Sequence, residues 1–291
     1  MELKQVKLCL GTAQFGIDYG INNTSGKIPK EEVKKILNFA YDNGITMIDT
    51  ASAYGESEAV LGEGIANTGK VFQIITKYPA NTELRPLQWI DKSLGLLKSN
   101  KIHGYLFHNY SIFQSNPEYI EDLIKIKEAG KTEKIGFSIY HPSEAEYILK
   151  HNVPCDIVQL PYNIFDQRFA FLFSELYNRG IDIYVRSVFL QGLFFIELEK
   201  IDKHFDSVRV YLREIRQLAV NYSINIAALC LGFVYTNEYV SNVVIGIDSL
   251  ENLKENINNF TLLKNKKISY DSFSKFAVND ENIILPYNWS K

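Results

Sequence analysis

Four side chains that could carry out acid–base chemistry follow apolar runs along the chain. Asp49 comes directly after the apolar run 45–48, and Tyr54 follows five residues later. Lys77 and His108 each end one of the next two apolar runs. A tyrosine is a poor acid at neutral pH because its reference pKa is about 10. A neighbouring cation would lower that pKa, and a carboxylate would hold the cation in place.

These four residues predict a proton-transfer site. We interpret Tyr54 as the general acid, Lys77 as the cation that stabilises its phenolate, and Asp49 as the partner of Lys77. His108 could donate a hydrogen bond to a substrate carbonyl oxygen. Taken singly, each residue has a plainer structural role, such as a strand cap, a loop tyrosine, a solvated lysine or a partly buried histidine. Their occurrence at successive strand ends favours the catalytic interpretation.

Strand and helix patterns alternate along the whole chain. The predicted strands are 6–10, 45–48, 72–76, 102–107, 134–137, 157–160, 181–185 and 242–245. The predicted helices are 29–43, 56–65, 86–97, 117–129, 143–150, 166–178, 208–222, 226–235 and 249–259. Eight such units indicate an α/β fold of the closed (β/α)8 TIM-barrel type. A doubly wound open sheet is the alternative, but Gly11 and Gly16 lack the Gly-x-Gly-x-x-Gly spacing that it would require.

The 291 residues are expected to form a single domain, with no linker dividing them. The barrel would occupy about residues 6–260. A C-terminal tail, 261–291, would pack on the barrel with the run 284–289 as an apolar anchor.

Composition limits the functional classes. The chain is 46% hydrophobic and 22% charged, which is typical of a globular protein. A net charge of −3 gives no basic field for holding nucleic acid. Cys9, Cys155 and Cys230 lie in apolar runs without metal-site spacing, so we expect reduced core thiols and no metal. The N-terminus lacks a signal-peptide pattern, and no apolar run could cross a bilayer, so we expect a cytoplasmic protein without a membrane partner.

The motif Asp-Thr-Ala-x-x-Tyr-Gly-x-Ser-Glu at 49–58 resembles the aldo-keto reductase superfamily, as do Ile-Thr-Lys ending at Lys77 and Leu-Phe-His ending at His108. The similarity runs from Leu10-Gly11-Thr12 to the helix containing residues 253–256. It implies that Asp49, Tyr54, Lys77 and His108 form a catalytic tetrad. In this scheme Tyr54 protonates a carbonyl oxygen while a nicotinamide cofactor, NADP or NAD, delivers hydride to carbon.

The resemblance also implies a set of cofactor-binding residues along the strand ends. Ser138, Gln159 and Asn163 would contact the carboxamide, and Ser187, Gln191 and Gly192 the pyrophosphate. The adenosine half would lie on the loop 246–249 and on Asn256, with a helix N-terminus nearby that suits phosphate. The complete expected set is Gly11, Thr12, Ser138, Gln159, Asn163, Arg186, Ser187, Gln191, Gly192, Gly246, Ser249, Asn252 and Asn256. The alternative interpretation is that they are ordinary loop and helix-cap residues without a role in cofactor binding.

Three features depart from the family pattern. The usual N-terminal β-hairpin is missing from the sequence pattern, because the first predicted strand begins almost at Met1. Arg186 occupies a position where many members place an aromatic ring on the nicotinamide, so its charge should weaken binding of the oxidised, positively charged ring. Gly246 and Asn252 replace cations found in strongly NADP-dependent members, so NADH should be usable.

The leading hypothesis is NAD(P)H-dependent reduction of an aldehyde or ketone to an alcohol. A regulatory redox sensor on the same fold, with little turnover, is a second hypothesis, and a lyase or isomerase barrel without nicotinamide is a third. Aromatic residues on strand-end loops are the expected walls of the substrate pocket. They are Phe15, Tyr19, Tyr110, Phe165 and Phe189. The polar loop 22–27 hints at a hydroxylated substrate such as a keto-sugar.

Overall fold

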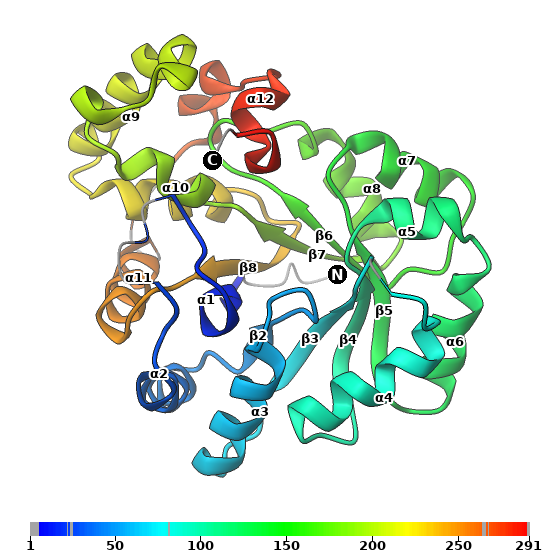
Figure 1. The fold of residues 1–291 in the computed structure, drawn as a ribbon. Coiled ribbons are helices and arrows are strands. Elements are labelled where there is room, and N and C mark those ends of the chain that lie inside the picture. The colour runs from blue at the N-terminus through cyan, green and yellow to red at the C-terminus, as the bar shows by residue number, and fades with distance from the viewer. Residues whose placement is uncertain are drawn as a thin grey trace.

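A computed structural model describes residues 6–21, 23, 26–80, 82–263, 266 and 268–289. Eight parallel strands form a closed barrel in chain order (Figure 1). The strands are β1 Lys7–Gly11, β2 Met47–Asp49, β3 Gln73–Tyr78, β4 Ile102–Phe107, β5 Thr132–Ser138, β6 Ile157–Pro161, β7 Asp182–Arg186 and β8 Val240–Gly246. Pairing of β1 with both β2 and β8 closes the sheet. The predicted (β/α)8 barrel is therefore confirmed, and the open-sheet alternative is excluded.

Helices surround this barrel. The longer ones are α2 Lys30–Asp42, α3 Ser57–Thr68, α4 Pro86–Leu97, α6 Tyr119–Glu128, α7 Pro142–Lys150, α9 Arg209–Asn221, α10 Ile226–Tyr235 and α11 Leu250–Leu263. The shorter ones are α1 Ala13–Gly16, α5 Tyr110–Ser115, α8 Phe173–Asn178 and α12 Glu281–Ile284. The 3-10 turns are η1 Ala170–Leu172, η2 Leu190–Phe195, η3 Leu198–Lys200, η4 Lys203–Val208, η5 Tyr270–Ser272, η6 Ser274–Phe276 and η7 Pro286–Asn288.

Several helical segments differ from the sequence-based expectation. The predicted helix 166–178 is wrong at its start, because α8 begins only at Phe173 after the short turn η1. The side chain of Asn163 accepts hydrogen bonds from the backbone N–H groups of Phe165 and Asp166, which holds this segment as a loop. The short helices α1, α5 and α12 were not predicted.

The barrel interior is filled by an apolar layer. One inward-facing side chain comes from each of seven strands: Cys9, Met47, Ile75, Leu106, Ile157, Tyr184 and Val244. On β5 the place is taken by Gly136, where a Cβ would lie 1.8 Å from the carbonyl oxygen of Ile157. Side chains in a strand return to the same face every second residue. The next inward positions are therefore Gly11, Asp49, Lys77, His108, Ser138, Gln159, Arg186 and Gly246.

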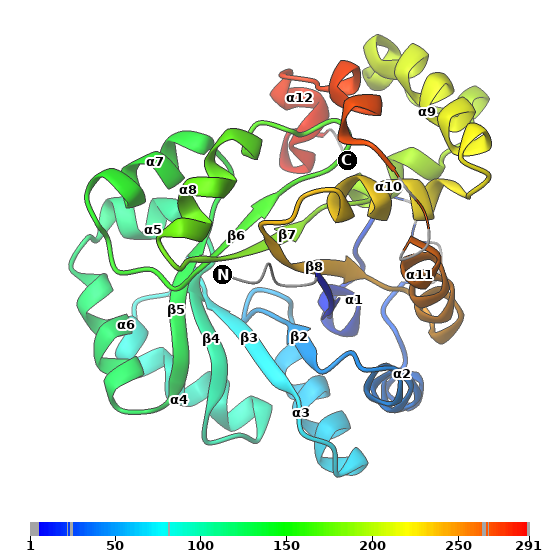
Figure 2. The same ribbon diagram turned by 180° about the vertical axis from the view of Figure 1, so that it is seen from behind.

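The described part of the C-terminal segment packs beside the barrel. In both views α12 lies between α9 and α7 (Figures 1 and 2). Ile284 and Leu285 are fully buried, and the ring of Trp289 contacts that of Phe205 with centroids 4.9 Å apart. Tyr287, by contrast, is 57% exposed, so only part of the expected anchor is buried. Residues 264, 265, 267, 290 and 291 of the expected tail lie outside the described residues.

Two further features concern the ends and the helices. The first described strand starts at Lys7, and no β-hairpin precedes it among the described residues, which begin at Val6. Within the same residues no single helix has the length and apolar composition to cross a membrane. One strongly bent pair, Lys203–Asn221 with Ile226–Tyr235 at 87°, satisfies those two criteria jointly.

Candidate active site

A buried ion pair stands at the centre of the barrel mouth. The Lys77 ammonium lies 2.8 Å from each carboxylate oxygen of Asp49 and 2.9 Å from the carbonyl oxygen of Thr50. Three acceptors thus match the three N–H donors of an ammonium group. The amide of Gln159 donates to Asp49 from 2.6 Å. Because Lys77 is 1% and Asp49 2% exposed, this pair is shielded from water and fixed in position.

Tyr54 lies beside this pair on the loop between β2 and α3. The Lys77 nitrogen is 5.3 Å from the centre of the Tyr54 ring, and the His108 ring is 5.6 Å from it at 88°. The loop packs closely on Gly16, where a Cβ would lie 1.7 Å from the carbonyl oxygen of Tyr54. Gly55 turns the chain with φ of +57°, a conformation that favours glycine. These two glycines let the Tyr54 loop sit directly against the end of α1.

The remaining polar residues of the 49–58 motif anchor this loop. The Ser57 hydroxyl donates to the carbonyl oxygen of Thr12 and lies 2.9 Å from the hydroxyl of Thr50. The buried Glu58 accepts hydrogen bonds from Thr76, at 2.6 Å, and from Ser52, at 3.1 Å. The motif therefore ties β1, β2, β3 and α3 together around Tyr54.

Burial keeps Tyr54 protonated in this structure. Removal from water raises the pKa of the Tyr54 phenol well above its usual range, and the Asp49 carboxylate raises this pKa further, whereas Arg186 lowers it. This direction is opposite to the sequence-based expectation that Lys77 would lower the pKa. The main cause is removal of the phenol from water, and the Asp49 carboxylate, itself paired with Lys77 at 2.8 Å, adds to the rise. Tyr54 therefore keeps its proton, although the cations Lys77 and Arg186 lie nearby.

His108 is neutral at physiological pH. Burial and the neighbouring charges of Lys77 and Arg186 lower the pKa of its imidazole to about 3. Its Nδ1 atom is buried without a hydrogen-bond partner. Buried N–H donors without a partner are rarer than buried acceptors without one. We therefore place the ring proton on Nε2, which leaves an N–H available for a carbonyl oxygen.

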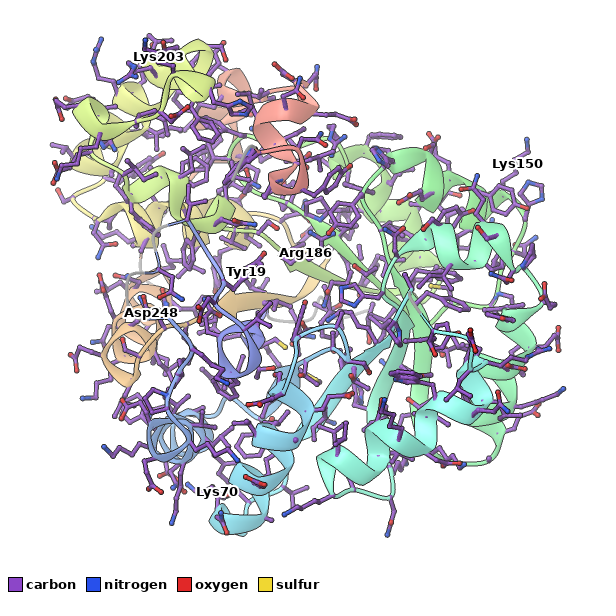
Figure 3. The ribbon with its side chains drawn as sticks, viewed as in Figure 1. Tyr19, Lys70, Lys150, Arg186, Lys203 and Asp248 are labelled. Atoms are coloured by element: carbon purple, nitrogen blue, oxygen red, sulfur yellow. The ribbon has the colours of Figure 1, made fainter. Side chains whose placement is uncertain are left out.

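A cavity of about 360 Å³ extends from Tyr54 to the start of α11. Asp49, Gln159 and Arg186 line its catalytic end. Figure 3 shows Tyr19 and Arg186 near the centre of the molecule and Asp248 towards α11. Lys77 and His108 do not belong to the wall, but both contact Tyr54, which does.

The loop after β7 forms one side of the cavity in an unusual backbone conformation. Ser187, Leu190 and Gln191 have φ of +60°, +45° and +50°, followed by Gly192 at +95°. Left-handed non-glycine residues cost free energy and often cluster at functional sites. Asn163 donates to the carbonyl oxygen of Ser187 and helps to hold the loop.

The structure brings most, but not all, of the predicted residues to this cavity. In its wall are Gly11, Thr12, Tyr19, Gln159, Arg186, Ser187, Phe189, Gln191, Gly192, Gly246, Asn252 and Asn256. Besides Lys77 and His108, six predicted cofactor or substrate residues are not in the wall: Phe15, Tyr110, Ser138, Asn163, Phe165 and Ser249. Of the polar loop 22–27, Asn23 lines the cavity, and residues 22, 24 and 25 lie outside the described residues.

The three aromatic residues among these six are core residues instead. Phe15 is 1% exposed, and Phe165 packs on Phe194 with ring centroids 5.0 Å apart. Tyr110 belongs to an aromatic cluster with Phe113 and Phe137. Their assignment to the substrate pocket has no support in this cavity, because packing inside the shell of helices takes up their apolar surface.

Two of the three polar residues among these six, Asn163 and Ser249, have side-chain partners within the protein. The Asn163 amide N–H donates to the carbonyl oxygen of Ser187, and its amide oxygen accepts a hydrogen bond from the backbone N–H of Phe165. The Ser249 hydroxyl donates to the Asp248 carboxylate. Ser138 is buried at the end of β5. Their predicted cofactor contacts have no support in the cavity geometry.

Sequence reasoning missed several residues of the wall. Gln14, Asp248 and Glu255 line the cavity, and the Oε1 atom of Gln14 is buried without a partner. All three lie within three residues of positions that the sequence did indicate. Spacing alone does not tell which side chain of a loop turns inwards.

The wall suits an extended dinucleotide. Gly11 and Gly246, at the mouths of β1 and β8, add no side chain to this wall, and Gln14 offers a buried acceptor without a partner among the described residues. The 14-residue helix α11 begins at the far end. No group of three or more His, Cys, Asp or Glu side chains that could hold a metal ion occurs in the described part of the chain.

Comparisons with known proteins agree with this geometry. Residues 7–273 match the Aldo/keto reductase family. The chain is 25% identical over 277 residues to an uncharacterized oxidoreductase, YqkF, of Bacillus subtilis (strain 168), covering 85% of this chain and 89% of that protein. It is 32% identical over 142 residues to aldo-keto reductase YhdN of the same organism, covering 44% and 43%. The holo form of aldo-keto reductase AKR11C1 from Bacillus halodurans shares the fold, with a TM-score of 0.75, 18% identity and 94% of each chain covered. The chain belongs to the aldo/keto reductase family.

Proposed function

We propose that this oxidoreductase reduces an aldehyde or ketone to an alcohol with a nicotinamide dinucleotide, and that Tyr54 is the proton donor. The observation that carries the proposal is the position of Tyr54, in the wall of the cavity and in contact with both the locked Lys77 and the neutral His108. When bound, the reduced dinucleotide supplies hydride to the carbonyl carbon.

Each side chain of the site has a separate role in the proposed reaction. Tyr54 gives its proton to the carbonyl oxygen as negative charge develops there. Lys77 and Arg186 then stabilise the phenolate that remains, and the Nε2–H of His108 donates a hydrogen bond to the same oxygen. Asp49 and Gln159 fix the Lys77 ammonium, so little reorganisation is needed during the reaction.

NADH is the preferred cofactor in this proposal. The far end of the cavity carries two carboxylates, Asp248 and Glu255, near the start of α11. Lys254 is paired with Glu251 at 3.1 Å, and it does not line the cavity. A 2′-phosphate would therefore approach like charges without a free cation, whereas a ribose hydroxyl can donate to a carboxylate.

The test uses purified protein with NADH or NADPH and a neutral aromatic aldehyde such as para-nitrobenzaldehyde. We expect steady, protein-dependent loss of NADH absorbance over many turnovers, with formation of the alcohol. Cofactor binding followed by a single turnover would instead support the redox-sensor hypothesis. Absence of binding of either dinucleotide would contradict the proposal altogether.

A further inference from the structure

Arg186 is a cation in the cavity wall without an acidic partner. Its guanidinium lies 4.1 Å from the centre of the Tyr140 ring and donates to the carbonyl oxygen of Ile139 at 3.1 Å. A second, longer contact of 3.4 Å reaches the Ser187 hydroxyl. Among the described residues, no carboxylate lies within ion-pair distance of Arg186. A guanidinium has five N–H donors, so about three remain for a ligand.

At this end Arg186 is the cation of the cavity wall, and the nearby buried carboxylate of Asp166 is paired with Arg168 rather than with Arg186. Lys77 and Asp49 neutralise each other, and the wall carboxylates Asp248 and Glu255 lie at the far end. Two phenols line the cavity at the same end: burial raises the pKa of both Tyr19 and Tyr54, and the charge of Arg186 opposes that rise. Figure 3 places Tyr19 beside Arg186 at this end.

The Tyr140 ring, which contacts the Arg186 guanidinium, is itself held in place by neighbouring residues. The Tyr140 ring meets that of Tyr287 edge-on, with centroids 5.1 Å apart. Arg168 donates to the carbonyl oxygen of Tyr140 and is paired with both Asp166 and Glu281. The C-terminal segment thus makes Tyr140 and Arg168 positioning residues. They hold the guanidinium over the cavity before a ligand arrives, which reduces the entropy cost of binding.

We propose that Arg186 binds a carboxylate on the carbonyl substrate, so that the preferred substrates are oxo acids or aldehyde acids rather than neutral carbonyl compounds. This inference rests on the proposed function. A planar guanidinium fork matches the two oxygens of a carboxylate and forms strong charge-assisted hydrogen bonds with them. The phenols of Tyr19 and Tyr140 can donate to the same group.

The first experiment compares para-carboxybenzaldehyde with methyl para-formylbenzoate, which has nearly the same shape without the charge. We expect the wild-type kcat/KM to favour the acid by at least about tenfold, the loss expected for one charge-assisted hydrogen bond. Arg186→Met should lower kcat for both aldehydes, because a charge that stabilises the phenolate is lost, and in addition it should abolish the preference for the acid through KM. Arg186→Lys should restore part of that preference. Arg179→Met is the matched control, because Arg179 is exposed and bonds only to Asn152 among the described residues.

The second experiment measures binding without turnover. Calorimetric titration of the NADH-loaded protein with benzoate should show binding to the wild type and none to Arg186→Met, while NADH affinity stays within about threefold. Equal loss for both aldehydes together with weaker NADH binding would mean that Arg186 serves the cofactor, which overturns the inference. Tighter binding of inorganic phosphate than of benzoate would overturn the carboxylate assignment. Failure to reduce either aldehyde would contradict the proposed function, and benzoate binding would still decide the role of Arg186.

Discussion

The two ends of the cavity are built in different ways. At the catalytic end, Asp49, Lys77 and Gln159 project from strand ends and bond to one another in a buried cluster. At the far end, Asp248 and Glu255 are exposed and lie on the loop after β8 and on α11. Buried charges are costly to leave unpaired, whereas exposed charges interact weakly because water screens them. The catalytic end should therefore tolerate little change, and the far end should accept changes that alter cofactor choice.

The largest effect is expected from Tyr54→Phe. Removing the hydroxyl removes the proposed proton donor, so kcat should fall by about 10²–10⁴-fold. The loop should keep its place, because it is anchored by Ser57 and Glu58 rather than by the phenol. Steady-state kinetics and NADH titration check this. A variant that keeps more than about a tenth of the wild-type kcat would remove Tyr54 from the acid role.

Lys77→Met should strongly destabilise the fold as well as reduce activity. The change leaves the buried Asp49 carboxylate without its cation, which typically costs about 3–5 kcal/mol of unfolding free energy. Asp49→Asn should reduce activity less, because Lys77 keeps its charge. Lys30→Met, which breaks an exposed pair with Glu63, is the control and should leave the denaturation midpoint nearly unchanged. Equal denaturation midpoints for Lys77→Met and Lys30→Met would contradict this view of the catalytic end.

His108 should make stability depend on pH. Its pKa falls from about 6.5 in the unfolded chain to about 3 in the fold, so the unfolded chain binds more protons between those values. The contribution of the neutral His108 to the free energy of unfolding is fully present above pH about 6.5 and is lost as the pH falls towards 3. Between pH 7 and 5 the wild type should lose roughly 2 kcal/mol relative to His108→Gln. Urea unfolding of both proteins at the two pH values tests this, and a constant difference would show that His108 titrates normally.

The smallest predicted effect belongs to the far end. Asp248→Asn removes one of two carboxylates and should tighten NADPH binding by about tenfold relative to NADH, which is about 1.4 kcal/mol. Rates with saturating cofactor should not change, because Asp248 is remote from Tyr54. Dissociation constants for both dinucleotides decide the point. An NADPH constant thousands of times smaller than that for NADH in the wild type would mean that the carboxylates do not face the ribose.

The catalytic end could be predicted from sequence because strands impose a simple rule. Asp49, Lys77 and Gln159 each follow by two residues an apolar residue of the barrel interior. Once eight strands are recognised, this spacing alone brings the polar residues to one ring. The rule does not extend to loops. Phe165 and Phe189 both follow strand ends, yet Phe165 packs in the core and Phe189 lines the cavity.

The pKa shift of Tyr54 and the contact between Arg186 and Tyr140 could not be predicted from the sequence either. The Tyr54 pKa is raised first by burial and then by the Asp49 carboxylate, and both depend on a three-dimensional placement that a sequence does not contain. The stacking of Arg186 on Tyr140 joins loops from β5 and β7, across the end of β6. Such contacts between loops are set by the curvature of the barrel, which emerges only in three dimensions.

Closure of the barrel has a consequence for synthesis of the chain. Strand β1 pairs with β8 from Lys7–Asn242 to Gly11–Gly246. The first strand of the barrel can therefore complete its pairing only after the last strand has been synthesised. Until then a partial sheet exposes two unpaired edges, and such edges promote association between chains. Pairing over so long a sequence separation is also slow to form. We therefore expect low temperature and slow expression to raise the yield of folded protein, since both limit contact between half-made barrels.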